Sequence, residues 1–172
     1  MANIKPFRGY MFNQNKIGDL GSVMSPPYDS ISKSEQEEFY ARHEYNAIRL
    51  AKGMRYDTDT EEDNPFTRAD SYMRSWIENG ILVRDDKPAI YLYEQEADGK
   101  SSFTNKGFVA LLELEELGKH VVSCEDTTPI NKKDRYELLS HTKANFNMIN
   151  CMYIESEKYL SRMMTEISDT EP

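Results

Sequence analysis

The segment from Val121 to Tyr153 places the strongest constraint on the fold. It begins with an apolar run typical of a strand, continues through the acidic, hydroxyl-rich loop 125–129, and ends in a second apolar run over 148–153. Between them, apolar residues recur at helical spacing over 136–146. Asn131 is the predicted N-cap, because its side-chain oxygen can accept a hydrogen bond from a free N–H group of the first helical turn. The segment therefore predicts strand, polar loop, helix and strand.

The two apolar runs are expected to share a sheet. We predict that 121–124 and 148–153 are neighbouring strands, with a helix over about 131–146 packed across them. Polar groups that gather where a strand leads into a helix are typical of binding and catalytic sites in α/β-type folds. The loop and the start of the helix therefore form the first candidate for a functional site.

The rest of the chain mixes the two kinds of element. Helices are predicted over 32–43, capped by Ser32 or Ser34, over 65–79, with Pro65 at its first position and Gly80 after its end, and over 156–167. The helix over 65–79 carries an apolar stripe that is expected to lie in the core, formed by Phe66, Ala69, Tyr72, Met73, Trp76 and Ile77. Strands are predicted at 4–10, 46–51, 81–83, 89–94 and 103–114, with a hairpin turn at 97–100 and Gly107 as a candidate bulge. This order is neither a strict βαβ alternation nor all-β. The predicted fold class is α+β, a mixed sheet with a β-hairpin and three to four packing helices.

Charge and hydropathy exclude several classes of protein. The 172 residues carry a net charge of −9 with a pI near 4.9, so sequence-independent binding to nucleic acid or to an anionic membrane is not expected. No apolar run approaches the roughly 18 residues of a membrane span. The start of the chain lacks the apolar core of a signal peptide, so a cytoplasmic location is the default expectation.

The cysteines and histidines do not predict a metal site. Cys124 and Cys151 both lie in apolar, strand-like runs, which predicts two buried, reduced thiols. His43, His120 and His141 share no metal-ligand spacing with them. Walker A, GxGxxG and GxSxG motifs are also absent from the sequence.

The polar residues around the central loop form the best candidate site. A carboxylate beside a substrate hydroxyl can act as a general base, and an arginine in a first helical turn can bind phosphate beside free N–H groups. The predicted catalytic residues are Glu125 and Asp134, and the predicted phosphate- or ligand-binding residues are Arg135, Thr127, Tyr28 and Asp29. The residues alone favour the alternative that the acids are solvated and that Asp134 and Arg135 form a surface pair.

Tyr28 and Asp29 join this prediction because the two prolines before them fix the backbone. A plain loop carrying an aromatic plug is the alternative for this segment. The acidic loop 52–64 is expected to be mobile, and both a solvated loop and an active-site flap remain open for it. We expect the site to bind an anion weakly unless Mg²⁺ accompanies it, because the nearby acids oppose a lone anion.

Five motifs occur in a recognisable order, namely IKPFRGY, SPPYDSIS, WIENGILVRDDKPAIYLYE, CEDTTPINKKDR and ANFNMINCMY. Together they resemble a bacterial and archaeal family catalogued as domain of unknown function number one thousand and fifteen, often labelled as related to the ParB/sulfiredoxin superfamily. The resemblance runs from residue 4 to about 153. Family members usually carry a His-Glu pair, then Thr, then Asp-Arg. Glu125, Thr127, Asp134 and Arg135 match that pattern, and Cys124 stands where the family has His.

The resemblance also implies a longer protein and an activity. Family members are about twice this length, and their second half carries an Asp-Gly-His-His-Arg motif, which this chain lacks. The implied domains are 4–155, an N-terminal α+β domain, and 156–172, a helix and tail leading into that second half. The motif is similar to one in ParB-like free serine kinases, where it handles phosphate.

By this analogy the chain is part of a nucleotide-dependent kinase for a small hydroxyl compound such as L-serine, with ATP or ADP and Mg²⁺. Glu125 would position or deprotonate the hydroxyl, Arg135 would hold phosphate, and Asp134 would orient Arg135 or Mg²⁺. Two alternatives remain: a small-ligand or protein-interaction module without chemistry, and a ParB-like DNA-partitioning factor. The net charge of −9 and the absence of a helix-turn-helix pattern disfavour the last. The sequence predicts no oligomeric state.

Overall fold

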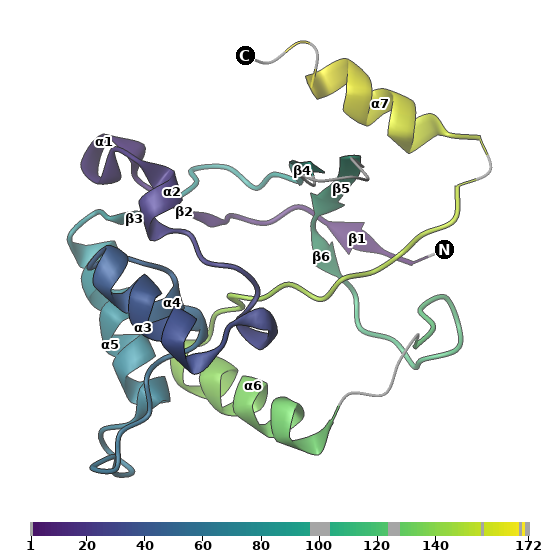
Figure 1. Cartoon of the computed structure of the whole chain (residues 1–172). Helices are drawn as coiled ribbons and strands as arrows, with labels where there is room; N and C mark the ends of the chain where they lie inside the picture. Colours follow the sequence, from purple (N-terminus) through teal and green to yellow (C-terminus); the bar gives the residue numbers. More distant parts are fainter. Residues whose placement is uncertain (1, 97–103, 124–127, 156, 169, 171–172) are drawn as a thin grey trace. The chain divides into compact units, whose positions relative to one another are not determined.

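The computed structural model describes residues 2–96, 104–123, 128–155, 157–168 and 170. The chain divides into two compact units. The helical unit comprises Tyr10–Asp85 and Cys124–Met148, and the hairpin unit comprises Met1–Gly9, Asp86–Ser123 and Ile149–Pro172. Helices and short antiparallel strand pairs occur together, which confirms the predicted α+β class (Figure 1).

The helical unit is built mainly from short helices. Its elements are β2 (Tyr10–Phe12), α1 (Gln14–Ile17), α2 (Leu20–Val23), the 3-10 turn η1 (Tyr28–Ser30), α3 (Lys33–Arg42), α4 (Ile48–Ala51), α5 (Pro65–Glu78), β3 (Leu82–Arg84) and α6 (Pro129–Thr142). Strands β2 and β3 pair antiparallel, with Met11 opposite Val83. Helix α5 packs against both α4 and α6, so it lies at the centre of the unit.

Local sequence signals mark the beginning of α3 and both ends of α5. Ser32 caps α3 in a reciprocal pair with Glu35, so the first of the two candidate caps is correct. Asn64 caps α5 with hydrogen bonds from the Phe66 and Thr67 amides, and Pro65 occupies the first position. Gly80 follows that helix with a positive φ of 66°, as predicted.

The core of the helical unit surrounds the single tryptophan. Leu50, Trp76, Ile81 and Leu82 form a buried cluster, and Trp76 retains only 3% exposure. The Tyr45 ring meets Trp76 edge-on at 5.7 Å between centroids, which is a favourable aromatic geometry. The apolar stripe predicted for α5 is therefore part of the core.

The predicted strand at 46–51 is wrong, because these residues form α4. Asn46 is completely buried, and its side-chain oxygen accepts a hydrogen bond from the Ile48 amide at 3.0 Å. Its amide group donates to the carbonyls of Ser22 and Met24 at 2.9 and 3.1 Å. A run of six residues is too short for its hydrophobic period to separate a strand from a buried helical turn.

Helix α6 begins earlier and ends earlier than predicted. Its N-cap is Thr128 rather than Asn131, with Pro129 at the first position, and it ends at Thr142 before the left-handed Lys143. Neither 121–123 nor 148–153 forms a strand, so the prediction that these runs are paired strands is wrong. Ile149 and Met152 are 89% and 92% exposed, which shows that the second run is not buried against a sheet.

The hairpin unit contains two antiparallel strand pairs and one helix. Its elements are β1 (Ile4–Lys5), β4 (Tyr91–Glu96), β5 (Thr104–Val109), β6 (Leu111–Leu112) and α7 (Tyr159–Ser168). Strand β1 pairs with β6, and β4 pairs with β5 in the predicted hairpin, whose turn lies outside the described residues. Helix α7 contacts β5 and buries Met164.

Gly107 lies in regular register opposite Tyr93, so the predicted bulge is wrong. A Cβ atom at Gly107 would lie 2.5 Å from Cε1 of Tyr93, inside van der Waals contact. The glycine is therefore explained by the close approach of an aromatic ring rather than by an irregular strand.

Cys151 is a free thiol and exposed, so its predicted burial is wrong. It lies in the extended segment that follows α6 rather than in a sheet. Cys124 lies outside the described residues. Across the part of the chain that the structure describes, no helix combines the length and apolar character needed to cross a membrane.

Candidate ligand-binding site

Three of the six predicted site residues come together in the helical unit. Tyr28 of η1 lies against Arg135 of α6, which in turn contacts Asp134. Asp29 is exposed and makes no side-chain hydrogen bond or ion pair with the described residues. Glu125 and Thr127 lie outside the described residues.

Arg135 joins several segments of the unit. Its guanidinium carbon lies 3.9 Å from the centre of the Tyr28 ring, a cation–π contact. Nη1 donates to the Ala51 carbonyl at 2.9 Å and to Oδ1 of Asn147 at 3.2 Å, and Nη2 donates to Oδ2 of Asp134 at 2.8 Å. The side chain therefore fixes α6 against the end of α4 and the turn η1.

The Nε donor of Arg135 has no partner among the residues that the structure describes. Its Nε atom is buried and makes no hydrogen bond to any of them. A buried donor left unpaired typically costs about 1–3 kcal/mol, and more when the group is charged. The Nε edge of the guanidinium is therefore a donor for an oxygen that reaches it.

Two further cations contact the same residues. Lys52 donates from Nζ to the carbonyls of Tyr28 and Ile31, and it forms no ion pair with a described acid. Arg55 pairs with Asp134 at 2.5 Å between Nη2 and Oδ1. Contacts through Tyr28 and Asp134 therefore link three cationic side chains, in a protein with a net charge of −9.

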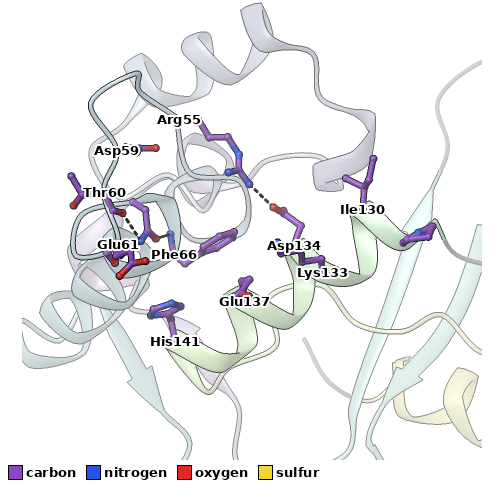
Figure 2. Close-up of a pocket in the computed structure, with 12 residues that line it drawn as sticks. Arg55, Asp59, Thr60, Glu61, Phe66, Ile130, Lys133, Asp134, Glu137 and His141 are labelled. Carbon is purple, nitrogen blue, oxygen red and sulfur yellow. Dashed lines mark hydrogen bonds and ion pairs between the residues drawn. The ribbon is translucent and has the colours of Figure 1, made fainter.

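An open groove of about 1210 Å³ lies beside this cluster (Figure 2). It runs between the loop before α5 and one face of α6, and Arg55 reaches across it to Asp134. Its lining consists of Arg55, Asp59, Thr60, Glu61, Asn64, Phe66, Pro129, Ile130, Lys133, Asp134, Glu137 and His141.

Phe66 supplies an aromatic surface inside the groove. The guanidinium carbon of Arg55 lies 5.4 Å from the centre of its ring, and the His141 ring stacks with it at 6.2 Å and 13°. The groove thus combines a planar cation, an aromatic ring and several carboxylates.

Among the residues that the structure describes, no group of three or more His, Cys, Asp or Glu side chains is arranged to hold a metal ion. Glu61 and Glu137 line the groove, and neither has an ion-pair partner in the described part of the chain. They are single carboxylates rather than a preformed ligand set.

The comparisons with known proteins identify a family. A family model described as "Protein of unknown function (DUF1015)" matches residues 4–172. The chain belongs to the DUF1015 family. The match confirms the resemblance seen in the motifs and extends it to the end of the sequence. Searches of curated proteins and of solved structures gave no match.

Membership in DUF1015 assigns no activity, because the family description names none. The ParB/sulfiredoxin relationship and the longer second half therefore stay predictions. The function of the DUF1015 chain is therefore inferred from the groove and from the contacts of Arg135.

The acidic loop of this DUF1015 chain is held against α5. Arg68 pairs with Asp59 at 2.8 Å and with Asp63 at 2.7 Å, and it also donates to the Met54 carbonyl at 2.8 Å. The Tyr56 ring lies 4.9 Å from its guanidinium carbon. These contacts hold the loop to α5 and place Arg55 and Asp59 on the groove.

Asp59 gives the loop a dependence on pH. Burial raises the pKa of Asp59, but the hydrogen bond from the Tyr56 amide and the contact with Arg68 outweigh it, so the pKa lies below its ordinary value of 3.8. A lowered folded-state pKa contributes stability above the unfolded value, which is lost as pH falls through the folded value. We therefore expect the Tyr56 amide proton to keep its chemical shift down to about pH 4 and to move below it.

An NMR titration of that amide measures this directly. In Asp59→Asn the shift should stay flat over the same range, because the titrating acceptor is gone. A midpoint for the parent above the ordinary aspartate value would contradict the expected direction.

Sequence analysis missed Lys52, Arg55, Phe66 and His141 as residues of the site. A usable signal was present for two of them, because Lys52 and Arg55 are basic residues at the start of a loop that is otherwise acidic. Phe66 was assigned to the apolar stripe of α5, whereas it lines the groove. His141 carried no signal, because its stacking depends on how α5 meets α6.

Proposed function

We propose that this chain is the phosphate-binding part of a nucleotide-dependent kinase that acts on a small hydroxyl compound similar to L-serine. The observation that supports this most is the linked set of Lys52, Arg55 and Arg135 around Tyr28 and Asp134. Phosphoryl transfer depends mainly on positioning and on electrostatic stabilisation of the phosphoryl oxygens. A cationic cluster beside a groove meets that requirement in an otherwise acidic protein.

In this proposal Arg135 holds phosphate and Asp134 orients it. The Asp134 carboxylate accepts a hydrogen bond from Nη2 of Arg135, and the Tyr28 ring lies against the face of the guanidinium. The unpaired Nε and the remaining Nη2 hydrogen form the edge that a phosphate oxygen pair would accept from. Glu125 keeps the proposed role of general base, with Thr127 beside the ligand.

ATP or ADP is proposed to bind together with Mg²⁺. Carboxylate oxygens are the protein ligands that Mg²⁺ prefers, and it commonly uses one or two of them along with phosphate oxygens. Glu61 and Glu137 supply unpaired carboxylates on the groove. They would oppose a lone phosphate, so binding should be stronger with Mg²⁺ present.

A binding module without chemistry is the second candidate. Two observations favour it: three hydrogen bonds of Arg135 go to its own chain, and both oxygens of Asp134 already accept from guanidinium groups. Such a site can recognise an anion without a free base beside it. Formation of ADP from ATP, or of AMP from ADP, in the presence of small hydroxyl compounds would distinguish the kinase from this module.

The proposed function predicts binding that depends on Arg135. Inorganic phosphate, MgADP and MgATP should each shift the amide signals of 128–135, and Arg135→Lys should weaken MgADP about tenfold because lysine cannot bind bidentately. The control is Arg74→Lys, since Arg74 is an exposed residue of α5 paired only with Asp70.

Folding of the variants can be checked through the fluorescence of the single Trp76. If Arg135→Lys does not fold, Lys52→Gln replaces it, with the same expected direction. The proposed function is wrong if none of the three ligands binds, or if the folded variant binds MgADP as tightly as the parent.

A further inference from the structure

We propose that Arg55 is the residue that first receives the ligand's phosphate, and that Asp134 is its resting partner, displaced when the anion binds. This inference rests on the proposed function and deepens it, because it assigns recognition to a residue outside the predicted site. Ligand binding is then an exchange of partners. The ion pair between Arg55 and Asp134, which crosses the groove, breaks, and an ion pair between Arg55 and phosphate replaces it.

Arg55 has the free donors that this role needs. A guanidinium carries five N–H groups, and within the described part of the chain only Nη2 of Arg55 donates a hydrogen bond, to Asp134. Its side chain is 65% exposed, whereas that of Arg135 is 25% exposed and makes three hydrogen bonds within the chain. A ligand in the groove therefore reaches Arg55 without breaking the contacts that fix α6.

The surroundings keep Arg55 in place when it releases Asp134. Its guanidinium lies over the Phe66 ring, and the Phe66 ring also stacks with the His141 ring. The loop that carries Arg55 is fastened to Arg68 of α5 through Asp59. Figure 2 shows Arg55 between this loop and α6, with Phe66 behind it.

The exchange favours phosphate over Asp134. An ion pair between solvent-accessible groups contributes little, and this pair is a single hydrogen bond from Nη2 of Arg55 to Oδ1 of Asp134. Phosphate can accept two parallel N–H bonds from one guanidinium and carries more charge than a carboxylate. Oδ1 of Asp134 then loses its partner and faces the groove, where it can bind the Mg²⁺ that accompanies a nucleotide.

The other basic side chains of the groove are weaker candidates. Lys133 is a single ammonium one turn before Glu137 on α6, without a planar fork. His141 already stacks with Phe66. Neither has a carboxylate partner to exchange among the residues that the structure describes.

Two single variants and their combination test the exchange with inorganic phosphate as the probe, followed by isothermal titration. Arg55→Gln should weaken phosphate about tenfold, because the receiving cation is lost. Asp134→Asn should tighten phosphate about threefold or more, because the competing carboxylate is gone. Combining both changes should abolish the tightening, because removal of the Asp134 carboxylate releases no cation when Arg55 is absent.

A matched control separates exchange from a general change of charge. Asp63→Asn removes one negative charge from the same loop, and Asp63 pairs with Arg68 rather than with Arg55. Its effect on phosphate binding should be smaller than that of Asp134→Asn. Equal effects of Asp63→Asn and Asp134→Asn on phosphate binding would overturn the exchange. Unchanged or weaker phosphate binding in Asp134→Asn would overturn it as well. If Arg135→Lys still weakens MgADP binding in either case, the proposed function stands. No binding of phosphate or of MgADP to the parent would overturn the proposed function and this inference with it.

Discussion

Replacing Asn46 by alanine is expected to lower the free energy of unfolding of the helical unit by about 2–4 kcal/mol. The side chain is fully buried and makes three hydrogen bonds, two to carbonyls of the 22–24 segment and one from the Ile48 amide. Alanine leaves three backbone groups without these partners, of which the Ile48 amide is buried and the two carbonyls are partly buried, and it opens a small cavity. Typical costs of about 1–3 kcal/mol for each unpaired buried group, reduced where water enters, set the expected range.

Urea denaturation followed through Trp76 measures this loss, because the single tryptophan lies in the core of the same unit. The control is Asn145→Ala. Asn145 is exposed and makes no side-chain hydrogen bond with the described residues, so its effect should stay within about 0.5 kcal/mol. Equal losses in the two variants would show that the buried amide does not hold the 22–24 segment to α4.

The second large effect is expected in the hairpin unit. Gly107→Ala should destabilise the β4–β5 hairpin by about 1–2 kcal/mol, although alanine ordinarily stabilises a strand relative to glycine by about 0.5–1 kcal/mol. The reason is the Tyr93 ring, which lies 2.5–2.6 Å from the position of the added Cβ atom. Tyr93 is 37% exposed, so its ring can rotate away from the new methyl group. The loss of stability should then equal the energy of the packing contacts that the ring no longer makes.

Hydrogen exchange of the hairpin amides is the appropriate measurement, because Trp76 reports on the other unit. The same substitution made in a Tyr93→Ala background should be neutral or stabilising, since no ring then opposes the new methyl group. The decisive result is that Gly107→Ala lowers the stability of the hairpin when Tyr93 is present and does not lower it in the Tyr93→Ala background. A loss of the same size in both would mean that the backbone, not the ring, requires glycine at 107.

The elements that could be predicted from the sequence are those fixed by interactions between residues close together in the chain. The ends of α5 could be predicted because Asn64, Pro65 and Gly80 act on backbone groups within a few residues of themselves. Helix α4 was mistaken for a strand because its form depends on Asn46 bonding to carbonyls more than twenty residues away. No local pattern contains that information.

The residues of the candidate site also include some that could be predicted from the sequence and some that could not. Arg135 and Tyr28 were predicted to meet, and they do. The expected position of Arg135 in the first helical turn is wrong, because α6 begins at Pro129 and Arg135 lies in its second turn. Arg55 was missed because its importance arises only when the loop, held by Arg68, brings it over Phe66 and across to Asp134. The exposed apolar run at 148–153 was assigned to a strand because hydrophobicity alone does not reveal whether a partner surface exists.

The interleaving of the two units along the chain has a consequence for folding during synthesis. The stretch Tyr10–Asp85 contains α3, α4 and α5 with most of the Trp76 core, so its local contacts can form while the ribosome is still producing the rest. Helix α6, with Arg135 and Asp134, arrives only after the strands of the hairpin unit have been made. The groove is therefore among the last features to assemble, and its nascent-chain precursor should expose the α6-facing side of α5 to chaperones until residue 142 has emerged from the ribosome.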